Sequence, residues 1–94
     1  MSLEVRAGLF AALGDPIRLR ILDILGVEKR CVCTLQEALA IAPNLLSYHL
    51  RVLREAGLVV ATRRGRWVDY RRSPTASGVI AAALPPDIGA EDAP

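Results

Sequence analysis

The 94-residue sequence is poor in the side chains that bind metals or form disulfides, with two cysteines and one histidine. Both cysteines fall in one tripeptide, Cys31-Val32-Cys33, so they cannot staple distant parts of the chain as in a small secreted domain. A structural zinc site takes four ligands, and a single chain offers too few good ones. The sequence therefore predicts neither a disulfide scaffold nor a structural zinc domain.

Other absences exclude further classes of protein. No apolar run approaches the length that crosses a membrane, and the N-terminus has no signal-peptide pattern. No nucleophile paired with a base, cofactor-binding loop or carboxylate cluster stands out, so we expect neither an enzyme nor a permanent cofactor. Without an export signal, the cysteines are most simply reduced thiols of a cytoplasmic protein.

The chain is nevertheless apolar enough to fold. Its 52% apolar share against 23% charged residues excludes a disordered chain. That share is high for so small a protein, which indicates that a partner subunit covers some apolar surface.

Basic residues are unevenly distributed along the chain. Eleven of the twelve are arginines, and five arginines lie within residues 63–72. Residues 85–94 carry three acidic side chains and no basic one, so residues 1–84 have a net charge of +5. A local arginine cluster on a small domain is typical of phosphate binding, although a merely solvated basic face is an alternative.

Hydrophobic periodicity and capping residues predict five helices, over residues 3–13, 16–25, 35–40, 43–56 and 73–84. Thr34 and Glu37 form a capping-box pattern at the start of the third. Strand-like runs at 58–62 and 67–71 flank Arg64-Gly65, which indicates a hairpin. The order predicts a mainly α fold with a small β-hairpin, a winged helix-turn-helix, as one domain over residues 1–84. Residues 85–94 are expected to form a flexible acidic tail.

The fourth predicted helix has two contrasting faces. Leu46, Leu50 and Leu53 form its buried row. We expect its other face to bind double-stranded DNA, because polar side chains there can reach base edges and phosphates in the major groove. The candidates on this helix are Asn44, Leu45, Ser47, Tyr48 and Arg51, and those on the wing are Arg63, Arg64 and Arg66.

Some of these aromatic and imidazole side chains have alternative roles. Tyr48 could pack on a neighbouring helix. His49 flanks the buried row, which favours a partly buried hydrogen bond over a metal or base contact. Trp67 and Tyr70 lie on opposite faces of one strand, so one of them is expected in the core.

Three stretches of the sequence together resemble the ArsR/SmtB family of metal-responsive repressors. They are residues 13–22 (LGDPIRLRIL), 46–59 (LSYHLRVLREAGLV) and 64–70 (RGRWVDY). The resemblance spans residues 7–74 and keeps the family's order and spacing. It implies a dimeric winged helix-turn-helix repressor that pairs through its first and last helices and leaves its operator when an inducer binds.

The resemblance also bears on the inducer. A zinc site of this family on the last helix needs Asp and His ligands, and residues 73–84 contain neither. Cys31-Val32-Cys33 instead resembles the thiol motif of the arsenite-responsive branch, and thiolates suit soft ions. We therefore expect Cys31 and Cys33 to bind As(III) or Sb(III) as inducer. The fuller motif has a third cysteine where this chain has Gln36, so the third ligand is water, a small cellular thiol or nothing.

The spacing of the cysteines suggests a mechanism. Residues i and i+2 of an α-helix point about 200° apart. Chelation by both thiols is therefore expected to unwind or block the first turn of the third helix and to spoil docking on DNA.

Three alternatives remain open at this point. The same fold could act as a thiol redox or persulfide sensor. In another class, the chain could be a small cytosolic thiol metal-binding protein that ignores DNA, which leaves the arginine cluster unexplained. The cysteines could also be ordinary buried residues.

Overall fold

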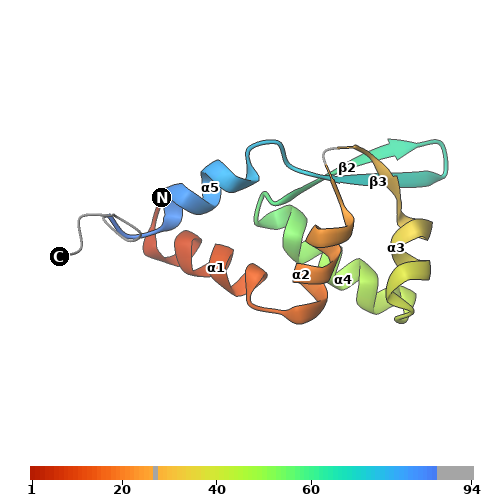
Figure 1. The fold of residues 1–94 in the computed structure, drawn as a ribbon, viewed down its shortest axis with the longest axis horizontal. Helices are drawn as coiled ribbons and strands as arrows, with labels where there is room; N and C mark the ends of the chain where they lie inside the picture. Colours follow the sequence, from red (N-terminus) through yellow and green to blue (C-terminus); the bar gives the residue numbers. More distant parts are fainter. Residues whose placement is uncertain (27, 87–94) are drawn as a thin grey trace.

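The computed structural model describes residues 1–26 and 28–86 (Figure 1). Its elements are α1 (Leu3–Leu13), α2 (Pro16–Ile24), β1 (Arg30–Cys31), α3 (Val32–Leu39), α4 (Pro43–Glu55), β2 (Val59–Arg64), β3 (Trp67–Arg72) and α5 (Ala76–Ala83). The order and layout confirm the predicted winged helix-turn-helix. Most of the predicted acidic tail, from residue 87 onward, lies outside the described residues. No helix in the described ranges is long and apolar enough to cross a membrane.

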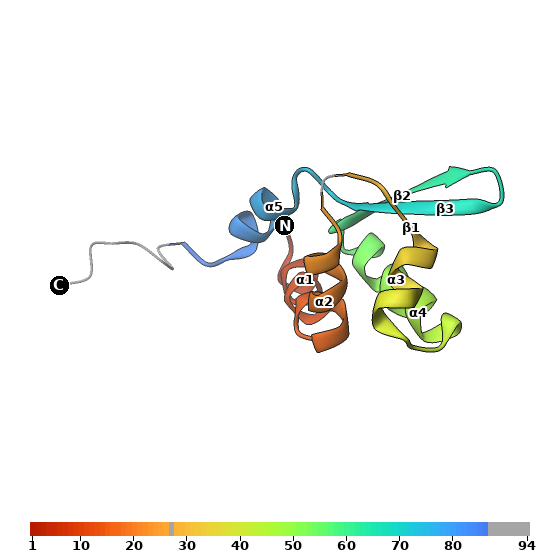
Figure 2. The same ribbon diagram turned by 45° about the vertical axis from the view of Figure 1, so that its right-hand side comes forward.

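The elements are arranged between two ends of the molecule (Figures 1 and 2). Helices α1 and α5 lie side by side at one end, and α3, α4 and the β2–β3 hairpin lie at the other, with α2 between them. One core of buried aliphatic side chains runs through both ends. The predicted buried row of α4 is confirmed, because Leu46, Leu50 and Leu53 are at most 2% exposed.

A glycine-dependent cap ends α4 and turns the chain into the hairpin. Gly57 has a φ of +77°, a conformation that glycine adopts without a side-chain clash. The N–H of Leu58 donates to the carbonyl of Leu53 and that of Gly57 to Arg54, both at 2.9 Å. These two bonds are those of a Schellman motif, which ends α4.

The sheet contains one strand more than the sequence predicts. Its order is β1-β3-β2, and both pairings are antiparallel. Strand β1 has two residues, Arg30 opposite Tyr70 and Cys31 opposite Asp69. A two-residue strand has no periodicity to detect, since only its pairing with β3 defines it.

The hairpin itself follows the prediction with a small shift. Gly65 and Arg66 form the turn, Gly65 has a φ of +62°, and Arg64 ends β2 instead of lying in the turn. Tyr70 packs against the core while Trp67 is 49% exposed, so the expected division between the two aromatic residues is confirmed.

Two helices start at residues other than those predicted, and four helices end one residue earlier than predicted. Helix α3 begins at Val32 with Cys31 as its N-cap, so the prediction that Thr34 and Glu37 form a capping box at the start of this helix is wrong. Pairing with β3 keeps the chain extended as far as Cys31, and the helix starts directly afterwards. Helix α5 begins at Ala76 and not at residue 73, because the N–H of Ser73 donates to the carbonyl of Leu58 at 3.0 Å and so prolongs the strand direction.

Candidate DNA-binding face and thiol site

The turn between α3 and α4 fixes the geometry of the helix-turn-helix. Ala40 follows α3 with a left-handed φ of 52°, and its N–H donates to the carbonyl of Gln36 at 3.0 Å. The side-chain amide of Gln36 donates to the carbonyl of Ile41. These bonds hold the turn closed and set the angle at which α4 leaves it.

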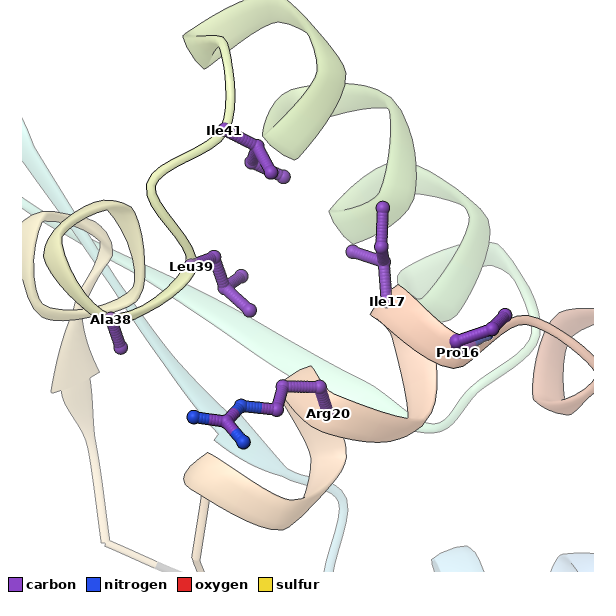
Figure 3. Close-up of a pocket in the computed structure, with 6 residues that line it drawn as sticks. All are labelled: Pro16, Ile17, Arg20, Ala38, Leu39 and Ile41. Atoms are coloured by element: carbon purple, nitrogen blue, oxygen red, sulfur yellow. The ribbon is translucent and has the colours of Figure 1, made fainter.

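A shallow groove of about 360 Å³ separates this turn from α2 (Figure 3). Aliphatic side chains of both elements line it, and the guanidinium of Arg20 extends across its rim. The lining residues are Pro16, Ile17, Arg20, Ala38, Leu39 and Ile41. None of them is a thiol, imidazole or carboxylate, so the groove is not a site for a soft metal ion.

The outward face of α4 carries the five side chains predicted to contact DNA. Asn44, Ser47 and Arg51 are exposed, and Leu45 and Tyr48 are 39% and 46% exposed. The Arg51 guanidinium lies 5.8 Å from the centre of the Tyr48 ring, a cation–π distance. Tyr48 therefore remains on the open face, with Arg51 beside it, although its edge also meets the ring of His49.

The three predicted wing arginines are not equivalent. Arg63 and Arg66 are exposed at the tip of the hairpin. Arg64 donates from Nε and Nη2 to the two carboxylate oxygens of Asp69, at 2.9 and 3.2 Å. Hydrogen bonds from Arg64 hold the pKa of Asp69 below its usual range, and the charge of Lys29 adds to this effect. Part of the positive charge of Arg64 is therefore compensated within the wing.

A residue that the sequence reasoning missed, Arg18, links α1, α2 and α4. Its Nε donates to the carbonyl of Ala12 at 2.8 Å and its Nη2 to that of Ala11 at 3.1 Å, at the end of α1. Its Nη1 lies 3.0 Å from Nδ1 of His49, which must be the acceptor because arginine has none. Arg18 shares a helix face with Ile21, which is fully buried, and that spacing is the signal that could have identified it.

The environment of Arg18 accounts for two neighbouring residues. His49 is 5% exposed, so its predicted partly buried hydrogen-bonding role is confirmed. Asp15 caps α2 by accepting from the N–H groups of Ile17 and Arg18 at 2.8 and 3.1 Å. The bond from the Arg18 backbone is the main reason why the pKa of Asp15 is lowered.

The cysteine pair lies where β1 becomes α3. Cys31 is half-buried and Cys33 is exposed, so neither is an ordinary core residue. The structure joins them as a disulfide with Cα atoms 5.2 Å apart, where the sequence reasoning expects reduced thiols. Cys31 has an extended backbone (φ −63°, ψ 144°), and its Sγ accepts from the N–H of Cys33 at 3.3 Å.

This geometry overturns one expectation about the mechanism. The 200° separation applies only if both cysteines are inside the helix, and Cys31 is not. The two sulfurs meet on one side of an intact α3, so chelation does not require the first turn to unwind, and the expectation that chelation blocks this turn stays a prediction.

The surroundings of the pair contain few further ligands. Within residues 1–26 and 28–86, no group of three or more His, Cys, Asp or Glu side chains is placed to hold a metal ion. Gln36, at the position of the third cysteine in the fuller motif, is turned toward Ile41 by its hydrogen bond. Asp69 lies opposite Cys31 in the sheet, which places both side chains on one face, but both of its oxygens accept from Arg64.

At the other end of the molecule, α1 presents an apolar face to solvent. Leu3 and Phe10, seven residues apart on one face, are 73% and 37% exposed, and Ala7 between them is exposed as well. Leu84, directly after α5, is 37% exposed. Nε of Arg6 donates to the carbonyl of Ala83 at 2.9 Å and holds α1 against α5.

Comparison with known proteins places the molecule in a family. The model of the bacterial regulatory proteins of the arsR family matches residues 15–60. An ArsR-like transcriptional regulator from Rhodococcus sp. RHA1 has a structure that superposes with a TM-score of 0.76 at 30% identity, over 89% of this chain and 80% of that one. The chain belongs to the ArsR family. Because this family consists of regulatory proteins, the expectation that the chain is not an enzyme is confirmed.

Two further similar proteins are informative about function. The arsenical resistance operon repressor of Escherichia coli K12 is 41% identical over 75 residues, which are 79% of this chain and 64% of the repressor. This ArsR-family chain thus matches less than two thirds of that relative's length. The structure of reduced HlyU from Vibrio cholerae N16961 superposes with a TM-score of 0.70 at 31% identity, over 85% of this chain and 82% of that one.

Proposed function

We propose that the chain is a homodimeric transcriptional repressor that leaves its DNA operator when Cys31 and Cys33 bind trivalent arsenic or antimony. The observation that carries this proposal is the position of the thiol pair, which caps the first helix of the helix-turn-helix. The E. coli relative, named as an arsenical resistance operon repressor, supports the same type of ligand.

The basic end of the molecule provides the DNA-binding surface. Helix α4 enters the major groove, where Asn44 and Ser47 contact base edges near its N-terminus and Arg51 contacts a phosphate. The wing follows the neighbouring backbone with Arg63 and Arg66. Arg64 contributes less, because its guanidinium is already bound to Asp69.

The apolar end provides the dimer interface. An exposed stripe formed by Leu3, Ala7 and Phe10 is unfavourable in water, and a second copy of α1 and α5 covers it. The two-fold symmetry of the dimer then places one α4 helix at each of the two half-sites of an operator.

Ligand binding acts at the junction between β1 and α3. A soft ion held by both sulfurs takes electron density from Sγ of Cys31, which otherwise accepts from the Cys33 N–H and caps α3. It also fixes the torsion angles of residues 31–33, which connect the sheet of the wing to the helix-turn-helix. An ion that binds better to the altered junction shifts the population away from the DNA-binding form by its difference in affinity for the two forms.

In the test, the protein is first reduced with a phosphine so that both cysteines are thiols. The DNA is a sequence that the protein selects from a random library. Arsenite, antimonite, cadmium, zinc and lead are added to the labelled complex, and release is followed by fluorescence anisotropy. We expect arsenite and antimonite to release the wild type and to leave Cys31→Ser bound. Serine is a good N-cap, so this variant keeps the start of α3. Release of Cys31→Ser at the same arsenite concentration would show the site assignment to be wrong.

A redox sensor with the same fold is the second candidate. The juxtaposition of the two sulfurs favours it, and one structural neighbour is named as the reduced form of HlyU from V. cholerae. A peroxide would oxidise the two thiols to a disulfide while it is reduced to water. DNA release by peroxide, with no release by arsenite, would replace the first proposal by this one.

A further inference from the structure

A continuous series of side-chain contacts connects α1 with the outward face of α4. It begins at the last turn of α1, where the guanidinium of Arg18 donates to the carbonyls of Ala12 and Ala11 at 2.8 and 3.1 Å. The last four carbonyls of a helix lack the usual partner one turn later, and the end of the helix carries partial negative charge, so a cationic donor binds them well. The end of α1 is thereby held to the first turn of α2.

The same guanidinium continues the series into α4. Its Nη1 lies 3.0 Å from Nδ1 of His49, which is 5% exposed. Because Nδ1 accepts this bond, the imidazole proton is carried by Nε2, and the ring has one tautomer and one orientation. A close-packed side chain that is fixed in this way transmits a displacement of its partner instead of absorbing it.

Beyond His49, the series reaches two side chains on the proposed DNA-binding face. The ring of Tyr48 meets the ring of His49 edge-on, with the ring centres 5.2 Å apart. The Arg51 guanidinium lies 5.8 Å from the centre of the Tyr48 ring. Both Tyr48 and Arg51 are exposed and lie outside the apolar core. Their placement therefore depends on these ring contacts.

We propose that Arg18 and His49 are positioning residues, through which the placement of α1 in the dimer sets the placement of Tyr48 and Arg51 on DNA. This proposal rests on the proposed function, in which α1 forms the dimer interface and α4 enters the major groove. Neither Arg18 nor His49 touches DNA in this role. Dimer formation fixes α1, and the series of contacts carries this constraint to α4, so each half-site is bound more tightly by a dimer than by a monomer.

The first test changes α1 and observes α4 by NMR. His49 is the one histidine of the chain, so the imidazole nitrogen signals need no further assignment. We expect one tautomer, with the proton on Nε2, in the wild type and a mixture in Arg18→Met. Phe10→Glu, which places a charge in the proposed dimer interface, should shift the signals of Tyr48 and Arg51 when Arg18 is present and leave them unchanged in Arg18→Met. Equal shifts in both backgrounds would overturn the proposal.

Variants of His49 test the two links of the series separately. His49→Phe keeps a ring beside Tyr48 but has no acceptor for Arg18, whereas His49→Asn keeps an acceptor in the place of Nδ1 but has no ring. We expect each change, and Arg18→Met, to weaken operator binding by roughly 3- to 30-fold, the size of effect that mutations within a coupled network have. Dimer affinity, measured by sedimentation, should not change. Arg18→Met combined with His49→Phe should bind no more weakly than the weaker of the two single variants, because both remove one contact.

A control variant separates positioning from stability. Ile24→Ala shortens a half-buried side chain that packs against the core at the last residue of α2, so it should destabilise the fold and leave operator affinity unchanged. Ile24→Val replaces it if the alanine variant does not fold. All affinities are measured by fluorescence anisotropy at a temperature where every variant is folded. Wild-type affinity in His49→Asn, or an equal loss of affinity in Ile24→Ala and Arg18→Met, would show that Arg18 and His49 act only through stability and would overturn the proposal.

Arsenite titration distinguishes failure of this proposal from failure of the proposed function. Release of the wild type by arsenite, with wild-type operator affinity in Arg18→Met and both His49 variants, would reject the positioning role and keep the repressor mechanism. No release by arsenite, with the expected losses of affinity in these variants, would reject the inducer and keep the positioning role. A Phe10→Glu protein that stays dimeric would overturn both the proposed interface and the positioning role, which begins there.

Discussion

The two ends of the molecule expose opposite chemistry to solvent. At the α1/α5 end, the exposed side chains include Leu3, Phe10 and Leu84, while at the α4/wing end they include Arg51, Arg63 and Arg66. Exposed apolar side chains gain free energy when another protein surface covers them, whereas exposed arginines gain free energy by contact with phosphate groups. This contrast agrees with the two partners proposed above, a second subunit at one end and DNA at the other, and a single core would then hold both in register.

The largest expected effect comes from changing the apolar end. Phe10→Glu places a charge in the proposed interface of both subunits, so the dimer should dissociate. Loss of the second half-site should then weaken operator binding by roughly 100-fold. Sedimentation measures the first effect and anisotropy the second. Leu19→Glu is the control, since Leu19 is a 48% exposed leucine of α2. A Phe10→Glu protein that stays dimeric would show that this end is not the interface.

The connection between the ends is tested at Arg18. Arg18→Met keeps the apolar stem but leaves the carbonyls of Ala11 and Ala12 and Nδ1 of His49 without this donor. We expect the free energy of unfolding to fall by about 2–3 kcal/mol, the cost of part-buried acceptors that lose their partner. Urea denaturation measures it. Arg20→Met, at an exposed position of the same helix, should lower the free energy of unfolding by less than about 0.5 kcal/mol. An equal decrease in both variants would show that the hydrogen bonds of Arg18 do not connect the helices.

The role of the basic end is tested by two wing variants, one that removes a positive charge and one that removes the negative charge that compensates Arg64. Arg66→Ala removes an exposed arginine, so DNA affinity should fall several-fold and the salt dependence should decrease by about one counterion. Asp69→Asn releases Arg64 from its ion pair, so the salt dependence should increase by up to about one counterion. Affinity measured over a series of salt concentrations gives both slopes. If Asp69→Asn leaves the slope unchanged, Arg64 is already available to DNA in the wild type.

The sequence predicted the elements of the basic end unequally well. Leu46, Leu50 and Leu53 recur at helical spacing, and Gly57 ends their helix, so α4 and its cap were predictable from local pattern. Strand β1 was not, because it exists only through its pairing with β3, and the N-cap of α3 moved from Thr34 to Cys31 with it.

That single non-local pairing also changed the interpretation of the thiol site. With Cys31 inside a helix, two thiols of this spacing cannot meet. With Cys31 in a strand, they meet without distortion of α3. Arg18 was missed for a related reason, since its acceptors lie on α1 and α4 and only the fold brings them together.

The smallest expected effect lies in the turn of the basic end, at Ala40. Its φ of 52° places the Cβ atom against the backbone, a strain that glycine does not have. Ala40→Gly should therefore raise the free energy of unfolding by roughly 0.5–1 kcal/mol, after the larger chain entropy of glycine is subtracted. Ala38→Gly is the matched control two residues earlier, inside α3 and exposed, where glycine should destabilise the helix. Thermal unfolding of the two variants measures the difference. Equal shifts for both would mean that the α3–α4 turn is unstrained and that its geometry depends on the Gln36–Ile41 contact instead.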